Sequence, residues 1–352
     1  MSRLRRTALV MVATLLVTGL ALAAPLAMRK ADGRVLAWTW KAEPELVVAM
    51  ATAQELTPQL RTARARREIL VSSGAYNSPQ LLQLSGVGPA DLLKSHGIEV
   101  VLDSPGVGND LQDHLQVRIV TRCSQRITLN DVVNNPVRRV LAGMQWAALR
   151  RGPLTIAAGT SGAFFKTSPR LASPDIQIHF IPFSTDKMGE KLHPFSGFTA
   201  SVCQLRPESR GTLRIRSADP AQPPEIRINY LATETDRRAF IDGIRILRGI
   251  LAKPALKEYV TEEVYPGAKV VSDDDILAFC RQTGSTVYHP TSTCRMGNDP
   301  LAVVDQRLKV RGIEGLRVID ASVMPDLMSG NTNAPIIMIA EKASDMILED
   351  AR

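Results

Sequence analysis

The sequence predicts an α/β domain in two separate parts and, between them, a second domain with a sheet and helices of its own. Residues 68–73 contain a short apolar run at 69–71, stop at Gly74 and pass into a helical pattern, which is typical of a buried strand followed by a turn and a helix. A second buried strand is expected at 316–319. In the middle of the chain, apolar and polar residues alternate at 176–181, and apolar residues recur on one helix face at 235–251.

The composition is that of an ordinary globular protein. Of 352 residues, 45% are hydrophobic and 22% are charged, and this length suffices for two domains. The 43 basic residues exceed the 35 acidic ones, which gives a formal net charge of +8. A basic run at 61–67 has no interleaved aromatic residues, so a solvated surface is favoured and no nucleic-acid partner is expected. The four cysteines form no C-x-x-C pair, so neither a disulfide framework nor a metal site is expected.

Residues 1–24 have the features of an export leader. Arginines precede an apolar stretch at 7–24, and small residues at 21–23 offer a cleavage position. Arg5 and Arg6 also form part of a loose twin-arginine pattern. The apolar stretch, roughly 18 residues, reaches the lower limit for a membrane span. Three interpretations stay open: an exported or periplasmic protein, a protein associated with a membrane through 7–24, or a misassigned start on a cytoplasmic protein.

Residues 25–66 match no pattern that assigns them to a domain, although 45–56 could form a short helix. The elements that follow are marked by capping and turn residues. Ser78 and Pro79 favour a helix that begins there and covers 80–84, because serine caps helices and proline suits their first position.

Later elements are marked in the same way. A second short helix is expected at 89–96, and strands at 212–216 and 225–229 flank a turn-rich segment. Ser272, followed by three aspartates, predicts the N-cap of a helix whose first turn carries negative charge.

Five segments carry motifs that occur together in one enzyme family. They are residues 67–88, 105–114, 288–297, 316–325 and 329–335. The last three have the sequences YHPTSTCRMG, LRVIDASVMP and SGNTNAP. In this order the segments resemble the glucose-methanol-choline (GMC) oxidoreductases, which oxidise alcohols with FAD. The resemblance covers the chain from the first of these motifs onward.

The resemblance implies a domain organisation. Residues 67–116 and 271–352 would form part of an FAD-binding α/β domain, and 117–270 would form an α+β substrate domain on a mostly antiparallel sheet. The family's FAD-binding domain opens with a glycine-rich G-x-G-x-x-G loop that holds the diphosphate. No such motif occurs in this sequence. The FAD-binding domain is therefore expected to be a remnant, and a complementary chain that carries the loop becomes a candidate partner.

His289 occupies the position of the catalytic base in the family that the chain resembles. Alcohol oxidation needs an acceptor for the hydroxyl proton, and a histidine that is neutral near pH 7 meets that need. Asn331 matches a second polar group, whose amide would donate a hydrogen bond to the substrate oxygen as negative charge develops. There are structural alternatives for both residues. His289 could make its hydrogen bonds within its own loop, and Asn331 could be present because asparagine favours turns.

The resemblance also assigns six residues to FAD. Two would lie beside the ribityl chain and diphosphate, two would contact the flavin ring through their backbone, and two would be further neighbours of the flavin. In that order they are Asp320 and Ala321, Thr332 and Asn333, and Asn109 and His114. The remaining histidines, His96, His179 and His193, match no motif and are interpreted as structural.

These assignments predict an FAD-dependent oxidoreductase that acts on CH–OH groups. A base would take the hydroxyl proton of a small-molecule alcohol while a hydride passes from its carbon to the flavin. The combination of His289 with Asn331 resembles the choline and aliphatic-alcohol dehydrogenase branch of the family. The alternatives are a catalytically inactive remnant of such an enzyme and one half of a split enzyme.

Overall fold

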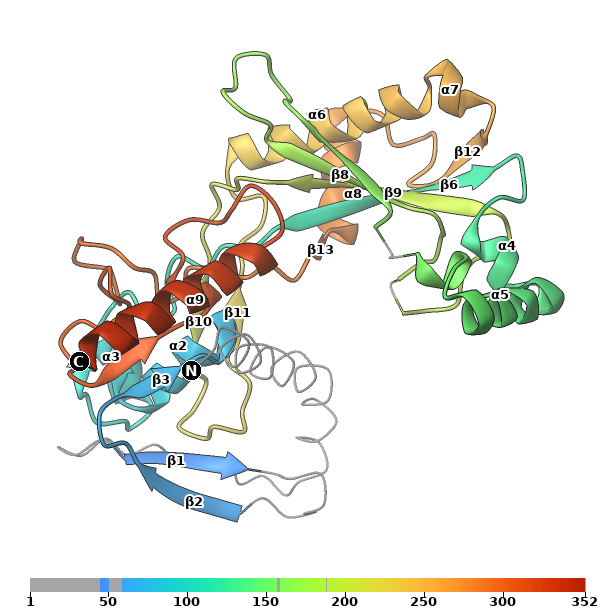
Figure 1. Cartoon of the computed structure of the whole chain (residues 1–352). Coiled ribbons are helices and arrows are strands. Elements are labelled where there is room, and N and C mark those ends of the chain that lie inside the picture. The colour runs from blue at the N-terminus through green and yellow to red at the C-terminus, as the bar shows by residue number, and fades with distance from the viewer. Residues whose placement is uncertain (1–44, 51–58, 157–158, 188, 352) are drawn as a thin grey trace. The chain divides into compact units, whose positions relative to one another are not determined.

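The computed structural model of the chain describes residues 45–50, 59–156, 159–187 and 189–351 (Figure 1). The expected leader at 1–24 lies outside these ranges. Within them, no helix is long and apolar enough to cross a membrane.

The described residues group into two compact units. Unit 2 consists of Asp113–Ser209 and Tyr230–His289. Unit 1 consists of the described residues up to Gln112, the segment Arg210–Asn229 and the described residues from Pro290 onward. The segment 210–229 thus groups with the α/β part of the chain, whereas the sequence patterns placed it within 117–270.

The centre of unit 1 is a pair of parallel strands. β3 (Ile69–Val71) pairs in parallel with β14 (Leu316–Val318), which confirms both predicted strands (Figure 1). Their apolar side chains share one hydrophobic core with residues of α2 (Gly74–Leu84) and α9 (Asn333–Asp350). Strand, turn and helix therefore follow one another as the apolar pattern indicates, with the helix packed back onto the strand.

The start of α2 differs from the prediction. The helix begins at Gly74 rather than at Ser78, and Pro79 lies inside it. A proline inside a helix removes the hydrogen bond to the carbonyl four residues earlier. Here that carbonyl belongs to Ala75, and it accepts a hydrogen bond from Thr293 Oγ1 at 2.6 Å. A residue far away in the sequence thus satisfies the group that the proline leaves unpaired.

Three further strand pairs and two short helices belong to unit 1. β1 and β2 are antiparallel, β4 and β5 are parallel, and β10 and β11 are antiparallel. The helix expected at 45–56 is therefore wrong over 45–50, which is a strand. In chain order the six strands are Glu45–Met50, Gln59–Arg64, Val87–Gly88, Leu102–Asp103, Thr212–Arg214 and Glu225–Arg227, and the helices are α3 (Ala90–Ser95) and η2 (Ala321–Val323).

Unit 2 is built on a six-stranded sheet with the order β12-β6-β9-β8-β7, in which β13 also pairs with β6. Every pairing in this sheet is antiparallel, which confirms the mostly antiparallel sheet that the sequence predicts. In the order just given the strands are Val260–Tyr265, Leu115–Cys123, Gly197–Gln204, Ile176–Ile181 and Ser161–Phe165, with β13 at Ser285–Thr286.

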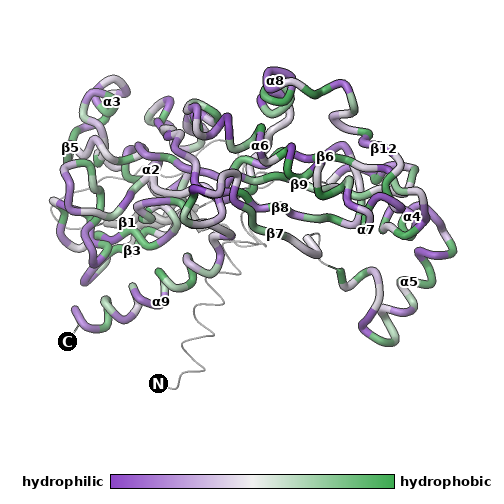
Figure 2. The backbone as a smooth tube through the Cα atoms, turned by 90° about the horizontal axis from the view of Figure 1, so that it is seen from above, coloured by the Kyte–Doolittle hydropathy of each residue, from purple (hydrophilic) through white to green (hydrophobic). Residues whose placement is uncertain are grey.

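One face of this sheet is covered by α6 (Glu234–Leu251) (Figure 1). Phe240 and Leu247 of α6 pack with alternate residues of β6, β8 and β9, which carry hydrophobic residues along their length (Figure 2). The expected helix cap is also present, because Ser272 caps α8 (Asp273–Thr283) through its side chain. The remaining helices are α4 (Leu129–Val133), α5 (Pro136–Leu149), η1 (Pro153–Thr155) and α7 (Pro254–Lys257).

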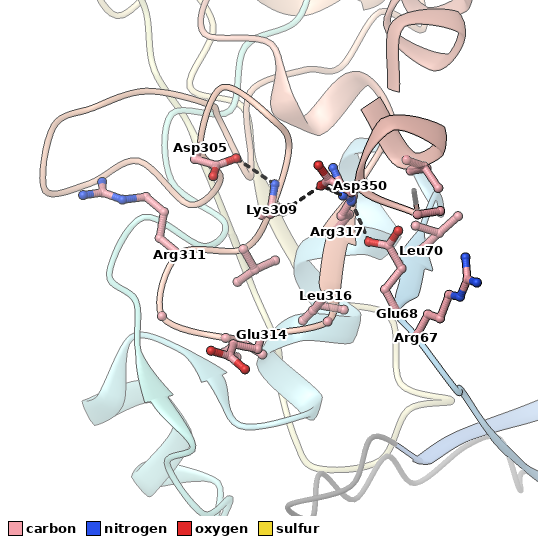
Figure 3. Close-up of a pocket in the computed structure, with 16 residues that line it drawn as sticks. Arg67, Glu68, Leu70, Asp305, Lys309, Arg311, Glu314, Leu316, Arg317 and Asp350 are labelled. Carbon is pink, nitrogen blue, oxygen red and sulfur yellow. Dashed lines mark hydrogen bonds and ion pairs between the residues drawn. The ribbon is translucent and has the colours of Figure 1, made fainter. Parts of the chain in front are cut away.

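A buried arginine connects several elements of unit 1 beside a pocket of about 1110 Å³ (Figure 3). Arg317 of β14 donates to Glu68 at 2.6 Å, to Asp350 at 2.5 Å and to the Arg307 carbonyl at 2.7 Å. Lys309 lies 2.7 Å from Asp350 as well. Lys309 and Arg317 hold the pKa of Asp350 well below its usual range. The cluster joins three parts of unit 1: Glu68, which precedes β3; Arg317 on β14; and Asp350 at the end of α9.

Candidate active site

A buried carboxylate positions the loop that carries His289. Asp113 precedes β6 and is 2% exposed. Its carboxylate accepts hydrogen bonds from Thr286 Oγ1 at 2.5 Å, from Tyr230 Oη at 2.5 Å and from the backbone N–H of His289 at 2.9 Å. Burial raises the pKa of Asp113, against the opposing effect of these hydrogen bonds. The sequence patterns did not single out Asp113, whose only signal is its place beside His114 in a family motif.

The residue before His289 has an unusual backbone conformation. Tyr288 has a φ of +62°, a left-handed value that is uncommon for residues other than glycine. Two hydrogen bonds hold the turn, from Tyr288 N to Thr286 Oγ1 at 2.7 Å and from Val287 N to the His114 carbonyl at 3.0 Å. Such conformations concentrate at functional sites, where surrounding contacts maintain them.

His114 and His289 are joined by a hydrogen bond between their Nδ1 atoms, which lie 2.9 Å apart, with the two rings at 77°. The other ring nitrogen of His114, Nε2, lies 3.0 Å from the carbonyl oxygen of Leu205. A carbonyl oxygen can only accept, so His114 carries a proton on Nε2. In a neutral pair its Nδ1 then accepts the hydrogen bond from Nδ1–H of His289. His289 is left with an unprotonated Nε2, which can accept a proton.

The surroundings of His289 favour the neutral imidazole. The pKa of His289 is lowered to about 4, chiefly by burial and next by His114; Asp113 opposes the shift, and His179 adds a smaller lowering. The ring is therefore uncharged near pH 7, which is the protonation state that a proton acceptor needs.

His179 belongs to the same neighbourhood, although the sequence patterns gave it only a structural role. It lies on β8, where Ser201 of β9 is its partner across the sheet, and burial lowers its pKa. It contributes the smallest of the effects that act on the pKa of His289. The signal that could have found it is the alternation at 176–181, which puts His179 on the face opposite to the core residue Ile178.

Asp320 stands where β14 ends, beside the start of α2. Its Oδ2 accepts from Ser78 Oγ at 2.5 Å and from Gly74 N at 3.0 Å, and its Oδ1 accepts from Ser322 N at 2.8 Å. These contacts hold Asp320 and Ala321 at the carboxyl ends of the two parallel strands. In α/β sheets, ligands bind outside this edge.

Three of the expected residues lead into α9. Thr332 is the N-cap and is buried, whereas Asn331 and Asn333 are exposed. The first turn of α9 contains no acidic residue, so its backbone N–H groups face no competing carboxylate within the turn. Asn331 belongs to unit 1 and His289 belongs to unit 2.

Asn109 is fixed by contacts within unit 1. Its Nδ2 donates to the Pro105 carbonyl at 2.6 Å, and its Oδ1 accepts from Arg214 Nη2. His114, the other expected neighbour of the flavin, belongs to unit 2, where it bonds to His289. Among the described residues, no group of three or more His, Cys, Asp or Glu side chains is arranged to hold a metal ion.

Two family models, both described as GMC oxidoreductase, match this sequence. They cover residues 36–116 and 207–340, and the first match begins inside the segment 25–66. The chain is 43% identical over 281 residues to the alcohol dehydrogenase [acceptor] of Pseudomonas putida, with 80% of this chain and 51% of the relative covered. It is 45% identical over 291 residues to the mitochondrial choline dehydrogenase of Mus musculus, with 82% and 49% covered. The chain spans about half the length of the curated relatives it matches.

Two solved oxidase structures are also similar in fold to this chain. A formate oxidase of Aspergillus oryzae RIB40 is similar with a TM-score of 0.77 at 28% identity, over 86% of this chain and 57% of that one. A fungal aryl-alcohol oxidase is similar with a TM-score of 0.71 at 26% identity, over 83% and 56%.

Proposed function

Because the chain belongs to the GMC oxidoreductase family, we propose that it oxidises the hydroxyl group of a small alcohol to a carbonyl, with FAD as the hydride acceptor. The observation that carries this proposal is the hydrogen bond between the Nδ1 atoms of His289 and His114, which leaves Nε2 of a neutral His289 without a proton. A base in this state takes the hydroxyl proton without first losing one of its own.

The other residues of unit 2 serve this proton transfer. His114 holds the ring of His289 in one orientation and one tautomer, and Asp113 holds its backbone. Asn331 of unit 1 is the proposed second polar group, which donates a hydrogen bond to the substrate oxygen as its negative charge grows.

The residues of unit 1 suit part of an FAD molecule. The strand ends beside Asp320 are open at Gly74, where a side-chain carbon would meet nothing within 4 Å. Asp320, Ala321, Thr332 and Asn333 would hold the cofactor, with Asn109 and His114 as further neighbours. When bound, FAD supplies the acceptor for the hydride.

The diphosphate of FAD has no matching loop in this sequence. The family's phosphate-binding motif, G-x-G-x-x-G, does not occur in it, so these residues do not fit that part of the cofactor. A complementary chain that carries such a loop would supply the missing contacts. The same observation supports the second candidate, an inactive remnant of an alcohol-oxidising enzyme.

The test is the reduction of flavin by alcohols. The purified chain is incubated with excess FAD, and the bound flavin is measured after removal of the free cofactor. Primary alcohols are then added without oxygen, and the loss of the oxidised flavin absorbance is followed. Bleaching by an alcohol supports the proposal, whereas bound FAD that no alcohol bleaches contradicts it. A chain that retains no FAD under these conditions favours the split enzyme or the remnant.

A further inference from the structure

A half-buried arginine of unit 2 has a shielded nitrogen without a hydrogen-bond partner among the described residues. Arg118 lies on β6, and its Nε is shielded from solvent. In the described part of the chain, this atom makes no hydrogen bond. Burial lowers the pKa of Arg118, which expresses the cost of removing the guanidinium from water. A partly buried guanidinium whose Nε has no acceptor among the described residues is suited to bind an anion that the protein does not itself supply.

Arg118 points away from the hydrophobic core. Its neighbours in β6, Val117 and Ile119, belong to the core beneath α6. Successive side chains of a strand point to opposite faces, so Arg118 lies on the other face. Across the sheet, Arg118 is opposite Ser201 of β9, and Ser201 is opposite His179 of β8. The three side chains form one row on the face that α6 does not cover.

This row lies beside the candidate base. β13, which leads into the loop of His289, pairs with β6 at Leu115 and Gln116, just before Arg118. The Arg118 end of the row therefore lies beside the strand that leads into the loop of His289.

The same face carries no negative charge on its three central strands. Its residues on β6, β9 and β8, beside the row itself, are Gln116, Val120, Arg122, Thr199, Cys203, Gln177 and Ile181. The edge strand β12, next to β6, contributes Glu262. Its carboxylate lies 2.7 Å from Arg122 and forms an ion pair with that residue. Asp113, near the base, is already bonded to Thr286 and Tyr230.

We propose that Arg118 binds an anionic group of the substrate, so that the alcohol oxidised at His289 is a hydroxy acid. A planar guanidinium with free donors matches a carboxylate through two parallel hydrogen bonds. Choline, in the name of the mouse relative, is a quaternary ammonium alcohol, and this cationic face would repel it. The inference rests on the proposed function for the identity of the reacting hydroxyl group. The binding of the anion by itself requires no turnover.

The experiment compares the binding of three alcohols of similar size, 3-hydroxypropanoate, 1-propanol and choline, to the full chain. Binding is followed by nuclear magnetic resonance through the ring signals of His179 and His289. We expect 3-hydroxypropanoate to bind best. Arg118→Gln should weaken it by a factor of roughly 10 to 100, the effect of losing hydrogen bonds to a charged group. Arg118→Lys should retain part of the affinity, and the binding of 1-propanol should not change.

Arg122 provides the matched control, because it lies on the same strand and face but is paired with Glu262. Arg122→Gln should leave the preference for 3-hydroxypropanoate intact. Arg118→Gln should melt at about the same temperature as the parent, since the half-buried guanidinium makes no hydrogen bond through Nε that the fold would lose. Tighter binding of choline than of 3-hydroxypropanoate, or a preference that persists in Arg118→Gln, would overturn the proposal. If the preference depends on Arg118 but no alcohol reduces bound flavin, the proposed function fails and the anion site stands.

Discussion

The Nδ1 atoms of His114 and His289 lie 2.9 Å apart, and the carbonyl of Leu205 determines which of them donates. Leu205 directly follows the core strand β9, so a backbone atom set by the sheet controls the tautomer of a loop histidine. The consequence is a histidine whose Nε2 has no proton and whose ring cannot turn without breaking a hydrogen bond. A proton acceptor is thus prepared before any substrate binds.

The tautomer should depend on His114. In His114→Leu the Nδ1–H of His289 has no acceptor, and its proton should be redistributed between the two ring nitrogens. His114→Gln should preserve the tautomer, because an amide can donate to Leu205 and accept from His289. Nitrogen-15 chemical shifts distinguish protonated from unprotonated ring nitrogens. His193→Gln, a change elsewhere in unit 2, is the control. An unprotonated Nε2 that persists fully in His114→Leu would show that His114 does not set it. In an active form, His114→Leu should lower kcat roughly five- to tenfold, the value of one hydrogen bond.

His289 should titrate far below an ordinary histidine. Because burial lowers its pKa to about 4, its ring signals should change near pH 4 rather than near the usual value of about 6.5. Titration by nuclear magnetic resonance measures this directly. A midpoint at the ordinary value would mean that the ring is solvated and that its neighbours do not act on it as the structure indicates.

The lowered pKa of His289 also predicts a dependence of stability on pH. Between the folded value of about 4 and the unfolded value, the unfolded chain binds a proton at this residue and the folded chain does not. His289 should therefore destabilise the fold increasingly as the pH falls through this window. Asp113, whose pKa is raised, acts in the opposite direction. The measurement is the free energy of unfolding by denaturant of the parent and of His289→Gln at several pH values. As the pH falls from 7 toward 4, the parent should lose stability relative to His289→Gln. A difference independent of pH would contradict the lowered value.

Asp113 should stabilise the loop of His289. Asp113→Ala leaves the hydroxyl groups of Thr286 and Tyr230 and one backbone N–H without their acceptor, which should cost about 2–4 kcal/mol of unfolding free energy. Asp113→Asn should cost less, because its amide oxygen can still accept. Asp186→Ala is the control, since that side chain is 82% exposed. Equal stability of Asp113→Ala and the parent in urea unfolding would show that the loop does not depend on this carboxylate.

Arg317 should stabilise unit 1. Arg317→Met leaves Glu68 and Asp350 without their shared partner and should cost about 3 kcal/mol, the lower end for breaking a buried pair, because both carboxylates retain some contact with water. Arg227→Met is the control, because Arg227 is 71% exposed in its pair with Glu225 and should matter little. Urea unfolding measures the loss of unfolding free energy in both variants. Equal losses in Arg317→Met and Arg227→Met would argue against a special role for the buried arginine.

Local sequence patterns predicted those elements whose determinants are local. The apolar runs at β3 and β14, the helical periodicity of α6 and the cap at Ser272 all appear as expected. The start of α2 was missed because its stability at Pro79 depends on Thr293, 218 positions from the carbonyl that it satisfies.

The candidate site was only partly accessible from the sequence. Motif resemblance indicated His289 and His114, but not the hydrogen bond that joins them, because that bond depends on where β9 places the carbonyl of Leu205. His179 and Arg118 were missed as site residues for a related reason. Their relation to His289 arises from strand register, which brings residues of β6, β9 and β8 into one row.

The central claim is that Nε2 of His289 takes the hydroxyl proton, and the rate of flavin reduction tests it most directly. The parent and His289→Ala are each saturated with FAD. If the chain alone does not retain FAD, the complementary chain that carries the glycine-rich loop is added. Each protein is then mixed with saturating alcohol in a stopped-flow instrument. We expect His289→Ala to retain its flavin, but the rate of flavin reduction should fall on the order of 10²-fold or more, the usual contribution of a positioned base, while His193→Ala keeps the parent rate. A parent-like rate in His289→Ala, or loss of flavin from that variant, would contradict the claim.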